Sequence, residues 1–465
     1  MADHPVSSSE DLEVTLSMKE RLGMSAGGFA SNLVWNAMGS YILFYYTDVI
    51  GIAPALLSTM MLLVRLLDGG ADIGMGMLVD RTHTKYGKAR PWIKWLAIPF
   101  GLSSMLLFSV PNLGAPGSFI YATVTYVVVN LIYTGISIPS STLPALVTKS
   151  QYERSVLNIV NTILSTLASL LVLTVVLPMV RMFGNGRMGW FITFAIFGAI
   201  ATILFYVTFY SSNERVTEST VKKDDVPFKI GFKALFSNKY WVIITLLLVF
   251  AFLSMGIGSS VALYFTTYIM KDAEFLGTIS VVSRIPAILV MAFVCAPLVK
   301  HIGKRNAVMI GCFVNIIGKA IMLLNMSDPT TIIISSFVLG IGGGLLGAGS
   351  FAFLADTVEY GEWHSGVRTE GLIFSAASFG LKVGMGFATA IVGWGLAYFG
   401  YKSGAPTQSA QAIKGIEVLY IWVPMLLNLV QMVLLYFYKL DKMYPQIMAD
   451  LKERNVADQA QESQD

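Results

Sequence analysis

Residues 53–79, APALLSTMMLLVRLLDGGADIGMGMLV, form a long apolar run that contains three charged side chains. The run exceeds the roughly 20 apolar residues that a helix needs to cross a bilayer. A charged side chain at the bilayer centre costs at least about 2.5 to 3.5 kcal/mol, so residues of this kind need a partner or a function. The stretch therefore predicts a transmembrane helix that carries buried chemistry.

The rest of the chain has the same apolar character. Of its 465 residues, 55% are hydrophobic and 13% are charged, whereas soluble domains carry roughly a quarter charged residues. This composition excludes a soluble globular protein. We predict an all-α membrane protein with twelve transmembrane helices, at residues 24–46, 53–79, 93–110, 119–139, 157–180, 190–210, 241–268, 276–299, 307–324, 331–354, 371–399 and 418–438.

A central polar stretch and a weak repeat predict two related six-helix bundles. Tyr45-Tyr46-Thr47 ends the first span and Tyr264-Phe265-Thr266 ends the seventh, and Arg65 and Arg284 recur at the same offset. Two such halves are the architecture of major-facilitator transporters. We expect a cytoplasmic N-terminal segment (1–21), an N-terminal bundle (22–210), a cytoplasmic linker (211–239), a C-terminal bundle (240–438) and a cytoplasmic tail (439–465).

The basic residues predict the topology. Lysine and arginine gather in alternate loops, around Arg81–Arg90, Lys149–Arg154, Arg215–Lys233 and Lys300–Arg305, and the opposite loops hold few. The positive-inside rule then places both termini in the cytoplasm of a multi-pass protein. We expect the bacterial inner membrane as its location. The two cysteines, Cys295 and Cys312, lie in apolar segments without metal-ligand spacing, so we expect neither a disulfide nor a metal site.

The charged residues of the second span predict an ion-coupling site. Arg65, Asp68 and Asp72 are spaced i, i+3 and i+7, which places them on a stripe roughly 60° wide. An ion-paired strut of Arg65 with Asp68 is one interpretation. One arginine neutralises one carboxylate, however, and this leaves Asp72 in need of a proton or a metal cation. The second repeat keeps the arginine but not the two acids, which favours coupling over a shared architectural role.

Two polar stripes predict a substrate cavity. Amides, hydroxyls and an aromatic ring suit a sugar, because they exchange hydrogen bonds with its hydroxyls and stack on its carbon-hydrogen patches. Hydrogen bonding between helices is the alternative role of such residues. The stripes comprise Asn32, Trp35 and Asn36 in the first span, and Asn130, Tyr133, Thr134 and Ser137 in the fourth.

Further charged residues lie in the second half. Lys382 is about eleven residues into the eleventh span, too deep to reach water easily, so we expect it to bind substrate or to pair with an acid across the cavity. A charged cluster is predicted in a cytoplasmic loop after the tenth span, either as an inner gate that pairs with basic loops or as a solvated loop. Its members are Asp356, Glu359, Glu362 and Arg368.

Several motifs resemble the glycoside-pentoside-hexuronide:cation symporter family, the melibiose-permease-like branch of the major facilitators. They are Tyr45-Tyr46-Thr47-Asp48-Val49, Arg65-x-x-Asp68-x-x-x-Asp72, Gly87-Lys88-Ala89-Arg90-Pro91-Trp92, Ile138-Pro139, and Asp356-Thr357-Val358-Glu359-Tyr360-Gly361-Glu362 with Arg368 and Glu370. The resemblance covers nearly the whole chain. It implies import of sugars or glycosides with H+, Na+ or Li+ by alternating access.

The resemblance also implies roles for single residues. Asp68 and Asp72 match the acids of the cation site and Thr134 a third ligand, while Tyr133 and Lys382 match positions in the substrate cavity. Sodium-using members often have asparagine where this chain has Ala71, which favours H+ because Na+ prefers about six oxygen donors.

The departures from the family pattern also concern the substrate. The family's galactoside-binding acids are replaced by Asn32 and Ser137, and a cavity tryptophan by Ser141, so a melibiose-like specificity is disfavoured. With these acids gone and Lys382 kept, a negatively charged sugar is a candidate substrate.

Together these patterns predict a secondary transporter that moves a sugar, glycoside or acidic sugar derivative with H+, and less favourably with Na+. An exporter and a membrane sugar sensor or scaffold that does not transport are the alternatives. We expect a lipid-embedded monomer that is not an enzyme, has no cofactor and binds no nucleic acid.

Overall fold

The computed structural model describes the chain except residues 1–15, 149, 216–234, 367–369 and 463–465. It divides into two compact units, which are described one at a time. The N-terminal unit comprises Met1–Thr220 with Ser403–Ala405, and the C-terminal unit comprises Val221–Lys402 with Pro406–Asp465. Most of the predicted linker and of the predicted N-terminal segment therefore lies outside the described residues.

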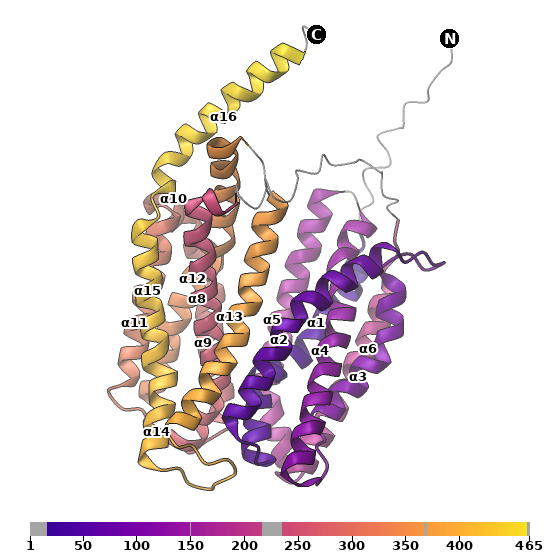
Figure 1. Ribbon diagram of the computed structural model, residues 1–465, viewed down its shortest axis with the longest axis vertical. Helices are drawn as coiled ribbons and strands as arrows, with labels where there is room; N and C mark the ends of the chain where they lie inside the picture. Colours follow the sequence, from indigo (N-terminus) through magenta and orange to yellow (C-terminus); the bar gives the residue numbers. More distant parts are fainter. Residues whose placement is uncertain (1–15, 149, 216–234, 367–369, 463–465) are drawn as a thin grey trace. The chain divides into compact units, whose positions relative to one another are not determined.

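The N-terminal unit is built from long helices that start at recognisable capping residues (Figure 1). Ser17 and Glu20 form a capping box at the start of the first helix, and Ser150 caps the fifth. Proline occupies the first turn of the second and third helices, where its missing N–H is tolerated. The helices are α1 (Met18–Phe44), the π-helical turn η2 (Tyr45–Val49), α2 (Pro54–Asp80), α3 (Arg90–Leu107), α4 (Gly114–Val147), α5 (Gln151–Met182) and α6 (Arg187–Ser211).

The C-terminal unit is also helical. Its described helices are α8 (Lys239–Tyr264), η3 (Phe265–Ile269), α9 (Phe275–Leu289), η4 (Val290–Val294), α10 (Cys295–Ile302), α11 (Lys304–Met322), α12 (Pro329–Ser365), α13 (Glu370–Tyr398), α14 (Ala410–Glu417), η5 (Val418–Trp422), α15 (Val423–Phe437) and α16 (Leu440–Glu462). A core of large buried side chains includes Tyr240, Phe353 and Tyr438. The predicted tail is helix α16, which adds Leu440, Ile447 and Leu451 to this core.

The predicted spans coincide with helical stretches, and the membrane-protein fold is confirmed. In the described part of the chain, nine stretches are long and apolar enough to cross a membrane by length and composition. The helices often run past the predicted ends, because polar residues at a membrane surface are compatible with a helix although they end an apolar pattern. Helix α4 continues through Pro139, where its span is predicted to end, and through Pro144 to Val147.

One predicted loop is wrong. Asp356, Glu359 and Glu362 lie in the last turns of α12, which continues to Ser365. Nothing in this segment forces an earlier end, and the helix stops where Gly366 adopts a left-handed conformation with φ 68°. The charged residues mark only the end of the apolar part of the helix, not the end of the helix itself. Arg368 lies outside the described residues.

Both units have a π-helical turn at the end of their first helix, at the repeated Tyr-aromatic-Thr motif. In the N-terminal unit this turn is held by buried tyrosines. The hydroxyl of Tyr45 donates to the carbonyl of Phe108 at 2.9 Å, and that of Tyr46 donates to the carbonyl of Leu107 at 3.1 Å. The motif therefore ties the end of α1 to the end of α3.

Candidate coupling site and polar cavity

Arg65 of α2 contacts an aromatic ring of α1, which in turn stacks on a ring of α4. Nη1 of Arg65 lies 3.6 Å from Oδ2 of Asp68, which is buried. The Arg65 guanidinium also lies 4.3 Å from the centre of the Trp35 ring of α1. Trp35 in turn stacks on Tyr133 of α4, with ring centres 4.7 Å apart. A chain of contacts thus joins the ion pair of α2 to α1 and α4.

The second carboxylate has a different partner. Oγ1 of Thr134 in α4 donates a hydrogen bond to Oδ1 of Asp72 at 3.2 Å. The two acids lie one turn apart on α2 and have different contacts. Asp68 forms an ion pair with a guanidinium, and Asp72 accepts a hydrogen bond from a hydroxyl. With both acids ionised, these two and Arg65 together carry one net negative charge. Binding of a single monovalent cation would neutralise the group.

The polar stripe of α1 takes part in hydrogen bonds along and between helices. Nδ2 of Asn32 donates to the carbonyl of Gly28 at 2.9 Å, and Nδ2 of Asn36 donates to the carbonyl of Asn32 at 2.8 Å. Oγ of Ser169 in α5 donates to Oδ1 of Asn36 at 2.9 Å. Asn36 thus fills the interhelical role that was the alternative to sugar binding, although all three α1 residues stay half-buried.

A polar cavity of about 220 Å³ lies among α1, α4 and α5. Ser137 of the predicted stripe lines it, and Ser141 does so one turn further along α4. Gly28 also lines it, and a Cβ at this position would overlap the amide of Asn161. The hydroxyl and amide groups of the lining are Ser25, Ser31, Ser137, Ser140, Ser141, Asn158 and Asn161.

The predicted residues of the second half lie in the C-terminal unit. Lys382 is half-buried in α13. Asp356 pairs with Lys304 at the start of α11. Nζ of Lys304 lies 2.7 Å from Oδ1 and 2.6 Å from Oδ2 of Asp356. This pair joins α11 to α12 within the unit. Glu359 keeps one buried carboxylate oxygen without a hydrogen-bond partner among the described residues.

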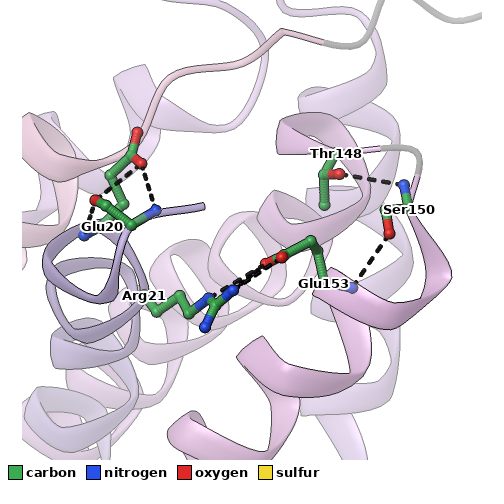
Figure 2. A network of polar contacts seen from close by, with 6 residues as sticks. Glu20, Arg21, Thr148, Ser150 and Glu153 are labelled. Carbon is green, nitrogen blue, oxygen red and sulfur yellow. Dashed lines mark hydrogen bonds and ion pairs between the residues drawn. The ribbon is translucent and has the colours of Figure 1, made fainter. Parts of the chain in front are cut away.

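Sequence reasoning missed a buried ion pair between the starts of α1 and α5, which Figure 2 shows. Arg21 donates to both carboxylate oxygens of Glu153, at 2.8 to 3.2 Å. The side chains are 16% and 4% exposed. Next to it, Glu20 pairs with Arg215, and the Ser17 backbone amide that donates to Glu20 lowers the pKa of that carboxyl. No spacing rule connects residues so far apart in the chain.

A second missed contact explains the conformation before α3. The carboxylate of Glu214 accepts hydrogen bonds from the backbone amides of Lys88, Ala89 and Arg90, at 2.7 to 2.9 Å. These amides have no partner within the helix, and a negative charge is favourable at a helix N-terminus. The motif Gly87-Lys88-Ala89-Arg90 is thereby bound to the residues that follow α6.

Comparison with known proteins assigns the family. The family model described as "MFS/sugar transport protein" matches residues 23–442. The chain belongs to this family. The motif-based identification as a glycoside-pentoside-hexuronide:cation symporter relative is therefore confirmed, and this sugar-transport family member is a membrane transporter rather than an enzyme.

Curated relatives align over nearly the full length of this family member. The isoprimeverose transporter of Lactiplantibacillus pentosus is 36% identical and aligns with 95% of this chain and 92% of its own. Two proteins of Escherichia coli (strain K12) are each 31% identical. The putative glycoside/cation symporter YagG aligns over 91% of this chain and 92% of its own, and the inner membrane symporter YicJ over 88% and 89%.

Solved structures support the fold alone. The crystal structure of the nucleoside transporter NupG matches with a TM-score of 0.61 at 14% identity, and the match covers 91% of this chain and 100% of that one.

Proposed function

We propose that this family member is a cation-coupled symporter that imports a sugar or glycoside, with H+ as the coupling ion. The observation that carries the proposal is the group of Asp68, Asp72, Arg65 and Thr134, because one monovalent cation neutralises it. The printed names of the relatives, a glycoside/cation symporter and an isoprimeverose transporter, support the substrate class.

The surroundings of Asp72 favour a proton over sodium. Hard cations prefer about six oxygen ligands. The side chain before Asp72 is the methyl group of Ala71, which supplies no oxygen where sodium-using relatives often have asparagine, and the Thr134 hydroxyl is a neutral oxygen in contact with Asp72. A proton needs only one carboxylate oxygen. Protonation of the acid pair would remove the net charge that opposes movement of α2 in an apolar environment.

The cavity among α1, α4 and α5 supports a hydroxylated substrate. Its serine hydroxyls can accept hydrogen bonds, although Ser140 and Ser141 already donate theirs to carbonyls of α4. Its asparagines add amide donors and acceptors, and the hydroxyls of a sugar require both kinds of partner. Trp35 and Tyr133 connect the coupling group to the helices that line this cavity. In this proposal, substrate and proton bind together before the transporter changes conformation. The family resemblance makes Lys382 a further proposed substrate-binding residue.

In the proposed topology, the protein lies in a bacterial inner membrane and both termini are on its cytoplasmic side. The alternation of basic loops supports it. The printed name of one relative, an inner membrane symporter, supports the location.

Asp72→Asn tests the coupling role. In proteoliposomes with an imposed proton gradient, the wild-type chain should accumulate radiolabelled isoprimeverose. The Asp72→Asn chain should lose uphill accumulation but retain equilibrium exchange, because an amide hydrogen-bonds without titrating. Asp80→Asn, at the exposed end of the same helix, is the matched control and should accumulate normally. Normal accumulation by Asp72→Asn would contradict coupling through Asp72, and a sodium requirement would contradict H+.

A further inference from the structure

The C-terminal unit contains a cavity that the coupling site does not use. It has a volume of about 320 Å³ and lies among α8, α11, α12 and α15. Most of its lining is apolar or glycine, and its polar members come from α8, α11 and α15. Gly258 and Gly343 line it, and a Cβ added at either would meet open space. The cavity therefore has room for a ligand.

Lys319 of α11 lines this cavity and is only 8% exposed. Its Nζ lies 3.9 Å from the centre of the Tyr420 ring. Among the described residues, no carboxylate lies within 4.0 Å of this ammonium group. A cation–π contact offsets only part of the cost of removing an ammonium group from water, and buried charges are normally paired. The site is therefore complementary to an anion.

Two buried amides of α15 line the same cavity with acceptors that are not satisfied within the described residues. Nδ2 of Asn428 donates to the carbonyl of Pro424 at 2.7 Å, and Nε2 of Gln431 donates to that of Leu427 at 3.3 Å. These bonds orient the amides and leave Oδ1 and Oε1 without hydrogen-bond partners in the described part of the chain. The two residues are 5% and 1% exposed. A buried carbonyl oxygen needs a donor, and a hydroxyl supplies one.

We propose that this cavity binds a small hydroxylated carboxylate. The carboxylate would pair with Lys319, and hydroxyls would donate to Oδ1 of Asn428 and Oε1 of Gln431. Asn315, one turn before Lys319 on α11, adds a further amide to the lining. One buried cation and two unsatisfied acceptors together favour such a ligand. A neutral sugar lacks the charge, and chloride or sulfate lacks the hydroxyls. The inference does not rest on the proposed coupling mechanism.

Equilibrium binding to the purified full-length chain in detergent tests the proposal, with D-gluconate as the probe and calorimetry as the readout. Gluconate should bind saturably, and sorbitol, which has the same carbon skeleton without the charge, should bind at least about tenfold more weakly. Lys319→Met should weaken gluconate binding by at least the same factor. The matched control is Lys239→Met, which removes an exposed lysine whose Nζ lies 5.0 Å from the centre of a tyrosine ring. It should bind gluconate like the wild type.

A second variant keeps the test decisive if Lys319→Met does not fold. Gly343→Leu retains the lysine and fills the cavity, so it should also abolish binding. Unchanged gluconate affinity in either folded variant would overturn the proposal, as would a wild-type chain that binds phosphatidylglycerol in this cavity but not gluconate. Because the readout is binding without a gradient, failure of uphill uptake in proteoliposomes would count against the proposed function and leave this result unaffected.

Discussion

Arg21→Met tests how much the buried ion pair between α1 and α5 stabilises the N-terminal unit. The substitution keeps an apolar stem and removes the guanidinium that donates to both oxygens of Glu153. The carboxylate of Glu153, whose side chain is 4% exposed in the intact pair, then loses this partner. Loss of one partner of a buried pair costs about 3 to 5 kcal/mol, and we expect the lower end because the Arg21 side is 16% exposed.

The assay needs a reporter in the same unit, because the two native cysteines are both in the C-terminal unit. We would replace Cys295 and Cys312 by alanine and introduce Val172→Cys, at a fully buried position of α5. The rate at which a thiol reagent labels this cysteine reports the opening equilibrium. Since about 1.4 kcal/mol corresponds to a factor of ten, Arg21→Met should raise the labelling rate about 100-fold.

The control is the neighbouring pair of Arg215 and Glu20, which is more exposed, at 34% and 28%. An exposed ion pair contributes about 0 to 1 kcal/mol, so Arg215→Met should raise the labelling rate less than about fivefold. The double variant Arg21→Met with Glu153→Leu should label nearly as slowly as the wild type, because it leaves no buried charge without a partner. The reasoning is refuted if Arg21→Met labels no faster than Arg215→Met.

Three further predictions concern other contacts. Trp35→Leu removes the ring that holds Arg65 at 4.3 Å, a contact of about 1 to 2 kcal/mol, and should lower the initial rate of proton-driven uptake about tenfold; an unchanged rate would show that the ring does not position the arginine. Lys304→Met strands the buried carboxylate of Asp356 and should destabilise the C-terminal unit by about 3 kcal/mol, seen as faster labelling of the native Cys312; labelling at the wild-type rate would contradict this. In Gly198→Val the new side chain would overlap the backbone of α3, which should lower the free energy of unfolding by about 1 to 3 kcal/mol and so lower the melting temperature. A melting temperature equal to that of the wild type would show that the two helices can separate there.

Much of the fold follows from the sequence because its causes are local. An apolar run of about 20 residues has to cross the bilayer as a helix, whatever lies beside it. The helical period then places Arg65, Asp68 and Asp72 on one stripe of residues 53–79. The predicted end of α12 is wrong for the same reason, since hydropathy reports where the apolar part of a helix ends and not where its hydrogen bonds end.

The partners of these residues depend on the rotation and spacing of helices that are far apart in the chain. The hydrogen bond from Thr134 to Asp72 and the contact of Arg65 with Trp35 join α2 to α4 and α1. The family resemblance suggested Thr134, but periodicity within one helix cannot show which face meets which neighbour.

The sequence by itself thus determined a multi-span helical transporter with two acids and an arginine inside the second span. Only the tertiary structure decided which groups those acids contact. It also decided that Arg21 pairs with Glu153 and that Lys319 lies over the Tyr420 ring beside a cavity. The physical reason is that burial of apolar length is a property of each segment. A pairing between polar side chains exists only once packing has brought separate segments within about 3 Å to 4 Å of each other.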